Sequence, residues 1–250
     1  MKELLDKLAA KYETPDFIKS DPVQFPHRYS KKQDIEISGI ISSSFAYGKR
    51  TLFIEKLKFI HSVMGKSPHE FCVNFTVKDE KHFENFRYRF NNGNDIITLI
   101  NSLSAIYQNN NSLEDLLVKF KTEDTPKNIL NVLIQHLYPD NCSKGFCYLL
   151  PNPSSNSACK RLNLFLKWMV RGGSVDLNNW TIIDKKNLII PLDTHVARIS
   201  RYLNLTSRKS NDWTTAREIT DNLKKFDAND PVKYDFALFG YGVEHPIIDL

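Results

Sequence analysis

The chain has 250 residues, of which 41% are hydrophobic and 25% are charged. This composition is typical of a folded globular protein and excludes a largely disordered chain. Apolar runs are only a few residues long, and charged residues occupy the place where a signal peptide has its apolar region. We therefore expect a cytoplasmic protein without a membrane span.

The four cysteines are too few for a disulfide scaffold and show no repeated CxxC spacing. We expect all four, Cys72, Cys142, Cys147 and Cys159, to be reduced thiols. Cys142 and Cys147, with His136 nearby, leave a zinc site as a weaker alternative because no second cysteine pair follows. The sequence therefore predicts no metal and no cofactor, an iron–sulfur cluster included.

Apolar residues recur with helical spacing along most of the chain. Asparagine-rich sequences around Gly93 and before Leu113, and the pair Thr125-Pro126, mark the starts of helices. We expect helices over residues 37–45, 53–64, 96–103, 113–120, 129–137, 162–169, 193–203, 216–226 and 230–242.

One segment, FRYRF at residues 86–90, alternates in the manner of a strand. Its arginines stand between aromatic rings, a composition that can also stack on nucleic-acid bases. A second exception is the polar, turn-rich sequence PNPSSNS at residues 151–157. With helical spacing dominant elsewhere, the sequence predicts an all-α fold.

The net charge of +5 is unevenly distributed along the chain. Residues 144–209 carry eleven Lys or Arg and three acidic residues, a net charge of +8, which leaves the rest at about −3. A basic segment in an otherwise slightly acidic protein is typical of proteins that bind a phosphate backbone. The alternative is that these charges scatter over several faces after folding.

The predicted helix in CKRLNLFLKWMVR begins with Lys160 and Arg161 and repeats positive charge at Lys167 and Arg171. The first turn of a helix also has unpaired backbone N–H groups, so this helix start suits a phosphate. Further along, Asp193 follows Pro191 by two residues and is predicted to be a helix N-cap. Taken separately, Asp193 can be a cap only and Lys160 a solvated surface lysine.

Together these two segments carry a family pattern. CKRLNLFL and LDTHVARI resemble the nucleophile helix and the following VDTH segment of helix-hairpin-helix DNA base-excision glycosylases of the endonuclease III type. FALFGYG resembles the helix that closes the same domain, and EISGIISSSFAYGKRTLFIEKL resembles the first two helices of the opposite lobe. Most of the chain resembles more closely a bacterial family of about this length without an assigned function, through FAYGKR, SACKRLNLFLKWMVR, PLDTHVARISR and DPVKYDFALFGYG.

The glycosylase resemblance implies a two-lobed helical domain with a central cleft. The whole chain, residues 1–250, would be one such unit. One lobe would span about residues 30–140, and the other about residues 141–250 with residues 1–29 packed alongside. The extra sequence between Lys160 and Asp193, which includes RGGSVDLNNWTIIDKKN, would form a loop or an insertion.

The resemblance also implies a reaction. Lys160 would attack the deoxyribose C1′ and form a Schiff base, for which it must lose its proton. Asp193 would help to activate this amine and stabilise positive charge on the sugar. The aberrant base would be turned out of the duplex. The function implied is that of a base-excision repair glycosylase, with a possible abasic-site lyase activity.

Further contacts follow from the same resemblance. The hairpin PNPSSNS has no glycine, so either Asn152 and Asn156 take its tight turn positions or the hairpin is remodelled. The residues expected to contact nucleic acid are Asn152, Ser155, Asn156, Ser157, Arg161, Asn163, Lys167, Arg171, His195, Arg198 and Arg201. Phe45 and Tyr47 would line the base pocket, although Phe45 also suits a core position and His195 a packed or capping role.

DNA is the favoured partner, and RNA is the second choice. A non-catalytic protein that binds DNA or structured RNA on a glycosylase-like fold is the alternative to an enzyme. A third hypothesis is that the basic segment serves another anionic partner or an unrelated small substrate.

Overall fold

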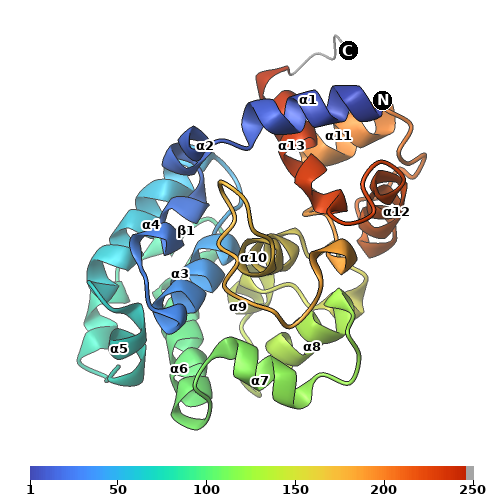
Figure 1. Cartoon of the computed structure of the whole chain (residues 1–250). Helices are drawn as coiled ribbons and strands as arrows, with labels where there is room; N and C mark the ends of the chain where they lie inside the picture. Colours follow the sequence, from blue (N-terminus) through green and yellow to red (C-terminus); the bar gives the residue numbers. More distant parts are fainter. Residues whose placement is uncertain (246–250) are drawn as a thin grey trace. The chain divides into compact units, whose positions relative to one another are not determined.

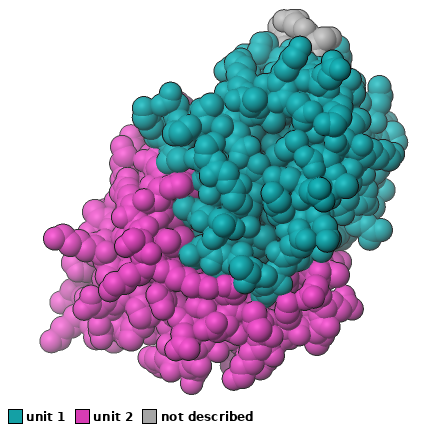
Figure 2. All heavy atoms as spheres, viewed as in Figure 1, with its two compact units in different colours: residues 1–20, 153–250 teal, residues 21–152 magenta. Residues whose placement is uncertain are grey.

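The computed structural model of the chain describes residues 1–245, which fold into two compact units (Figure 1). Unit 1 comprises Met1–Ser20 and Pro153–Leu250, and unit 2 comprises Asp21–Asn152 (Figure 2). Nearly all regular structure is helical, which confirms the all-α expectation. Among the described residues, no helix is both long and apolar enough to span a membrane.

Unit 2 consists mainly of helices that pack around a core of aliphatic and aromatic side chains. Its elements, with η for 3-10 helices, are η1 (Pro22–Gln24), η2 (Pro26–Arg28), α3 (Lys32–Ser44), α4 (Arg50–Met64), α5 (Pro68–Val73), η3 (Asp79–Phe83), β1 (Arg87–Tyr88), β2 (Asn91–Asn92), α6 (Gly93–Asn109), α7 (Leu113–Phe120), α8 (Pro126–Leu137) and α9 (Lys144–Leu149). The predicted start signals are confirmed, because Asn92, Ser112 and Thr125 cap α6, α7 and α8.

Unit 1 brings the two ends of the chain together. Its elements are α1 (Lys2–Tyr12), α2 (Pro15–Ser20), η4 (Pro153–Ser155), α10 (Lys160–Val170), η5 (Lys185–Asn187), α11 (Thr194–Tyr202), α12 (Trp213–Lys224), η6 (Pro231–Lys233) and α13 (Tyr234–Glu244). α13 packs against both α1 and α11 (Figure 1). The predicted helices of this half correspond to α10–α13, whereas α1 was not predicted although Leu5, Ala9 and Tyr12 recur on its buried face.

The boundaries of the units differ from the lobes expected at residues 30–140 and 141–250. Residues 21–29 and 141–152 belong to unit 2. α9 belongs there because Ser143 Oγ donates a hydrogen bond to Asp95 Oδ1 at 2.6 Å, and Asn91 Nδ2 donates one to the Gly145 carbonyl at 2.7 Å. These contacts bind the start of α9 to the start of α6.

The expectation that all four cysteines are reduced thiols holds for two of them and is wrong for the other two. The structure pairs Cys142, which precedes α9, with Cys147 on α9 as a disulfide, with Cα atoms 6.2 Å apart. Cys72 and Cys159 are free and buried. The His136 ring, considered above for a zinc site, donates a hydrogen bond from Nδ1 to the Val132 carbonyl at 2.8 Å. Among residues 1–245, no group of three His, Cys, Asp or Glu side chains is arranged to hold a metal ion.

The close packing of α1 on α13 depends on Gly240. A Cβ atom at this position would lie 2.3 Å from Cγ of the Tyr12 ring. Lys11 Nζ and Tyr12 Oη each donate a hydrogen bond to Glu244 at 2.7 Å, which fixes the two helices against each other. The absence of a side chain at Gly240 therefore lets the helices approach.

We expect Gly240→Ala to lower the free energy of unfolding by about 1–2 kcal/mol, because overpacking outweighs the helix propensity of alanine. Urea unfolding followed by circular dichroism measures this change. Gly172→Ala is the matched control, because its Cβ would meet no atom nearer than 3.5 Å. Equal stability of the two variants would contradict the steric explanation.

Candidate active site

The loop before α10 adopts a turn without glycine. Asn156 has φ of 60° and Cys159 has φ of 46°, both in the left-handed region, whereas Asn152 does not. Asparagine tolerates this conformation better than most residues, so Asn156 takes one of the tight positions proposed for it. The carbonyl of Asn156 accepts a hydrogen bond from the Trp213 N–H at 3.2 Å, which holds the loop against the start of α12.

α10 and its C-cap residue carry three cationic side chains in line. Lys160, Lys167 and Arg171 are spaced i, i+7 and i+11, which places them in line along a helix. Lys160, in the first turn, is partly exposed, whereas Lys167 and Arg171 are 1% and 4% exposed. The same face therefore runs from the accessible start of the helix into the interior of unit 1.

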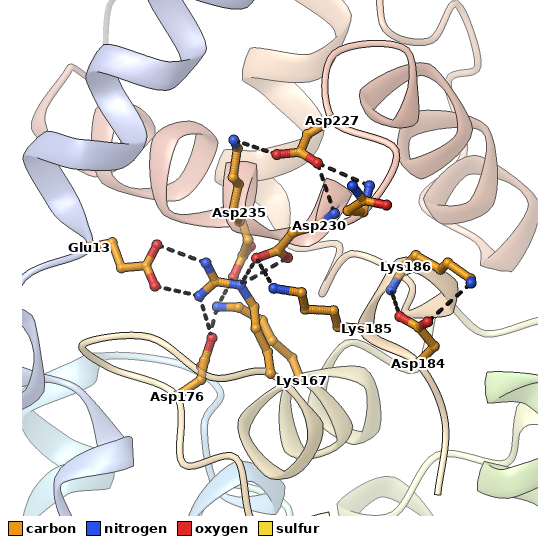
Figure 3. Close-up of polar contacts among 12 residues, drawn as sticks. Glu13, Lys167, Asp176, Asp184, Lys185, Lys186, Asp227, Asp230 and Asp235 are labelled. Carbon is orange, nitrogen blue, oxygen red and sulfur yellow. Dashed lines mark hydrogen bonds and ion pairs between the residues drawn. The ribbon is translucent and has the colours of Figure 1, made fainter. Parts of the chain in front are cut away.

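The expectation that Arg171 contacts a phosphate is corrected by its partners. Its guanidinium lies among three carboxylates, with Nη1 2.5 Å from Glu13 and 2.8 Å from Asp176, and Nε 3.0 Å from Asp230. Figure 3 labels these three acids. Each of these acids comes from a different segment of unit 1. Arg171 is thus saturated by internal ion pairs and joins these segments.

Lys167 is corrected for the same reason. Its Nζ lies 2.9 Å from Asp235 Oδ2 and 3.8 Å from Asp176 Oδ1, and 3.7 Å from the centre of the Phe236 ring. Burial alone would lower the pKa of Lys167, but the charges of Asp176 and Asp235 outweigh it and raise the pKa. This ammonium is therefore a charged part of the interior.

Asp193 is the N-cap of α11, as predicted. Its Oδ1 accepts a hydrogen bond from the Val196 N–H at 2.8 Å, and the residue is partly exposed. The bond fixes the carboxylate at the start of the helix, while solvent still reaches the side chain.

The charges of both Lys160 and Asp193 act on the pKa of the buried Asp235. Burial raises the pKa of Asp235 and the charge of Lys167 lowers it. The charge of Asp193 also raises this pKa, and that of Lys160 also lowers it. Both predicted catalytic side chains therefore lie within electrostatic reach of one carboxylate on α13, and both are accessible to solvent.

The remaining residues expected to contact nucleic acid differ in accessibility. Asn163 is 1% exposed, and its Nδ2 donates a hydrogen bond to the Ala158 carbonyl at 3.0 Å. The expectation of a nucleic-acid contact at Asn163 is therefore corrected, because the side chain fastens the loop to α10 from inside. The expectation stays a prediction for the exposed Asn152, Ser155 and Asn156 and for the partly exposed Ser157 and Arg161.

The basic residues of α11 hold that helix to its surroundings. His195 Nδ1 lies 3.0 Å from the Gly242 carbonyl, and Arg198 Nη2 donates to the same carbonyl at 2.7 Å. Arg201 binds the carbonyls of Arg208 and Lys209. His195 thus has the packing role considered above. Because all three residues remain partly exposed, their contact with nucleic acid stays a prediction.

The two residues assigned to a base pocket belong to unit 2. Phe45 is fully buried, with its ring 5.7 Å from that of Phe86, so the pocket assignment is corrected in favour of the core. Phe45 continues the helical spacing of the apolar residues of α3, which indicates a core position. The resemblance to the family does not show whether a residue is buried. Tyr47 is partly exposed and donates a hydrogen bond to Asn91 Oδ1 at 2.5 Å.

Sequence reasoning missed Asp235 and Glu13. A signal for Asp235 was present, because a lone acid in the apolar sequence YDFALFGYG must find a cation when the helix is buried. Lys167 in LNLFLKWMV is the complementary signal. Glu13 lies at the end of α1, and nothing in its neighbourhood indicated a partner 158 residues away.

Asp176 makes this ion cluster sensitive to pH. Burial raises the pKa of Asp176 from 3.8 to about 6, with Glu13 adding to the rise and Lys167 and Arg171 opposing it. Between these two values the folded state holds a proton that the unfolded state has lost. Rising pH therefore lowers the free energy of unfolding across this range.

We expect the stability difference between the wild type and Asp176→Asn to shrink from about pH 4.5 to about pH 7.5, because only the wild type loses this proton. Urea unfolding at the two pH values measures the difference. The control is Asp16→Asn, whose carboxylate is exposed and paired with Lys19. A difference that stays constant or grows with pH would contradict the assignment.

Comparison with known proteins identifies one family. No curated protein matches the chain, and no solved structure matches it. A family model described as protein of unknown function (DUF2400) matches residues 21–244. Because this match covers all of unit 2 and most of unit 1, the chain belongs to the DUF2400 family.

Proposed function

We propose that the chain is a DNA base-excision enzyme of the helix-hairpin-helix glycosylase type, with Lys160 as the nucleophile and Asp193 as the assisting carboxylate. The observation that carries this proposal is that Lys160 stands in the first turn of α10 and Asp193 caps α11, with both side chains partly exposed. An amine and a carboxylate that solvent reaches are the two groups that attack on a sugar requires.

The chemistry divides between these two groups. The neutral Lys160 amine attacks C1′ of the deoxyribose, and the bond from C1′ to the base breaks as the base leaves with the electron pair and takes up a proton. The attached nitrogen then gives up one of its two protons, and its lone pair forms the C1′=N bond of an iminium as the bond from C1′ to the ring oxygen breaks and that oxygen takes up a proton. Asp193, held by the Val196 N–H, supplies fixed negative charge beside the positive charge that develops on the sugar.

Lys160→Ala is expected to abolish covalent trapping by borohydride on DNA that contains a susceptible lesion or an abasic site. Trapping requires an iminium that hydride can reduce, and alanine cannot form one. Gel mobility of the crosslinked protein is the measurement. Lys209→Ala, an exposed lysine of unit 1, is the matched control and should trap normally. If the wild type neither releases a base nor traps on a broad panel of lesions, the enzyme proposal is wrong.

Asp193→Asn separates charge from capping, because asparagine caps a helix about as well as aspartate. We expect stability to change by a few tenths of a kcal/mol while single-turnover base release slows about a hundredfold. Asp212→Asn is the control, because Asp212 caps α12 through the Thr215 N–H at 2.8 Å. An Asp193→Asn rate equal to that of the wild type would remove Asp193 from the reaction.

The alternative function is binding of nucleic acid without cleavage. One observation favours it: the N-cap bond to Val196 gives Asp193 a structural role that needs no chemistry. In that case binding would weaken as salt increases, no product would form, and Asp193→Asn would bind like the wild type.

A further inference from the structure

A tight hairpin in unit 2 presents an arginine and a phenylalanine at its tip. β1 and β2 pair antiparallel with Arg87 opposite Asn92 and Tyr88 opposite Asn91, which leaves Arg89 and Phe90 as a two-residue turn. Arg89 has φ of 50°, in the left-handed region that side chains other than glycine rarely adopt. Such a conformation persists only where the surrounding structure holds it, and it is often found at binding sites.

The base of this hairpin is firmly held. Asn91 Nδ2 donates hydrogen bonds to Asp95 Oδ2 at 3.0 Å and to the Gly145 carbonyl at 2.7 Å. A Cβ on Gly145 would lie 2.8 Å from the Phe90 carbonyl, so α9 is in close contact with the turn. The hairpin therefore holds its tip in place without covering it.

The tip is the outer edge of an aromatic cluster. Phe90 is 60% exposed, and its ring centre lies 4.7 Å from that of Tyr148, which is 42% exposed. Tyr148 in turn lies 5.1 Å from Tyr47, and Tyr47 lies 4.9 Å from Tyr88. A large aromatic side chain left this open contributes little to the core, so its face is available for another planar group.

The sequence segments that carry the cluster are basic. Residues 47–50, 86–92 and 144–148 carry five Lys or Arg and no Asp or Glu. The Arg89 guanidinium carbon lies 5.7 Å from the centre of the Phe90 ring. Exposed rings with cations between them match the two parts of a nucleotide, because the base stacks on a ring and the phosphate attracts the cation.

We propose that Tyr47, Arg89, Phe90 and Tyr148, supported from below by the buried Tyr88 ring, form a stacking platform for unpaired bases of a DNA strand. The choice of DNA over RNA rests on the proposed function. The platform itself rests on the hairpin geometry and the local charge, and it lies in unit 2, whereas Lys160 and Asp193 lie in unit 1. Base stacking on the platform can therefore be measured in a protein that cannot react.

The experiment uses the full-length chain and fluorescence anisotropy with a labelled single-stranded DNA of mixed sequence. We expect Phe90→Ala to weaken binding about tenfold, because the variant loses the ring on which one base stacks. Phe90→Trp should restore binding. A strand of the same length made of abasic sites keeps the phosphates but lacks bases, so the wild type should bind it more weakly, and Phe90→Ala should bind it like the wild type.

Phe120→Ala is the matched control in the same unit. Phe120 is 44% exposed with Lys119 Nζ 5.1 Å from its ring centre, but it lies outside the platform, and its loss should leave binding unchanged. Equal binding by Phe90→Ala and Phe120→Ala, equal wild-type affinity for normal and abasic strands, or tighter binding of RNA of the same sequence would overturn the proposal. Each arm of this experiment measures binding alone, without base release or covalent trapping, so its result is separate from the outcome of the trapping experiment.

Discussion

The neutralisation of Arg171 inside unit 1 is the interaction on which this unit depends. A buried guanidinium is stable only if carboxylates replace the water that it loses, and breaking one such pair leaves an uncompensated charge. Glu13, Asp176 and Asp230 make this replacement from the N-terminal segment, the loop after α10 and the segment before α13. Arg171 is satisfied only where these three segments of unit 1 meet, so one side chain joins the N-terminal segment to the segments on either side of α11.

This constraint fixes the orientation of α10 about its own axis. Because Arg171 and Lys167 must face their carboxylates, the residue seven positions before Lys167 on the same face is also determined. That residue is Lys160, at the end of the helix that solvent reaches. The buried ion pairs thus hold the proposed nucleophile in one direction, and they do so from two turns away.

Local structure could be predicted from the sequence, but the distant residues that pair with buried charges could not. Helical spacing predicted α10 and α11, and the position of Asp193 predicted its capping bond, because both depend on neighbouring residues. The partners of Arg171 could not be predicted, since attraction between charges does not indicate which of many distant acids folding brings close. Phe45 shows the same limit, because a family pattern does not report burial. A charged residue within an apolar helix, such as Lys167 or Asp235, is the sequence signal that indicates a buried ion pair.

The two lysines of α10 also differ in what chemistry they allow. An attacking amine must release its proton, and the pKa of Lys167 is raised by Asp176 and Asp235, which holds that amine in its charged form. Lys167 is also enclosed, so no sugar can approach it. Lys160 shares the face of α10 but lies at its open end. On this face, therefore, the interior cation has a structural role, and the outer, partly exposed lysine is the one left for the proposed reaction.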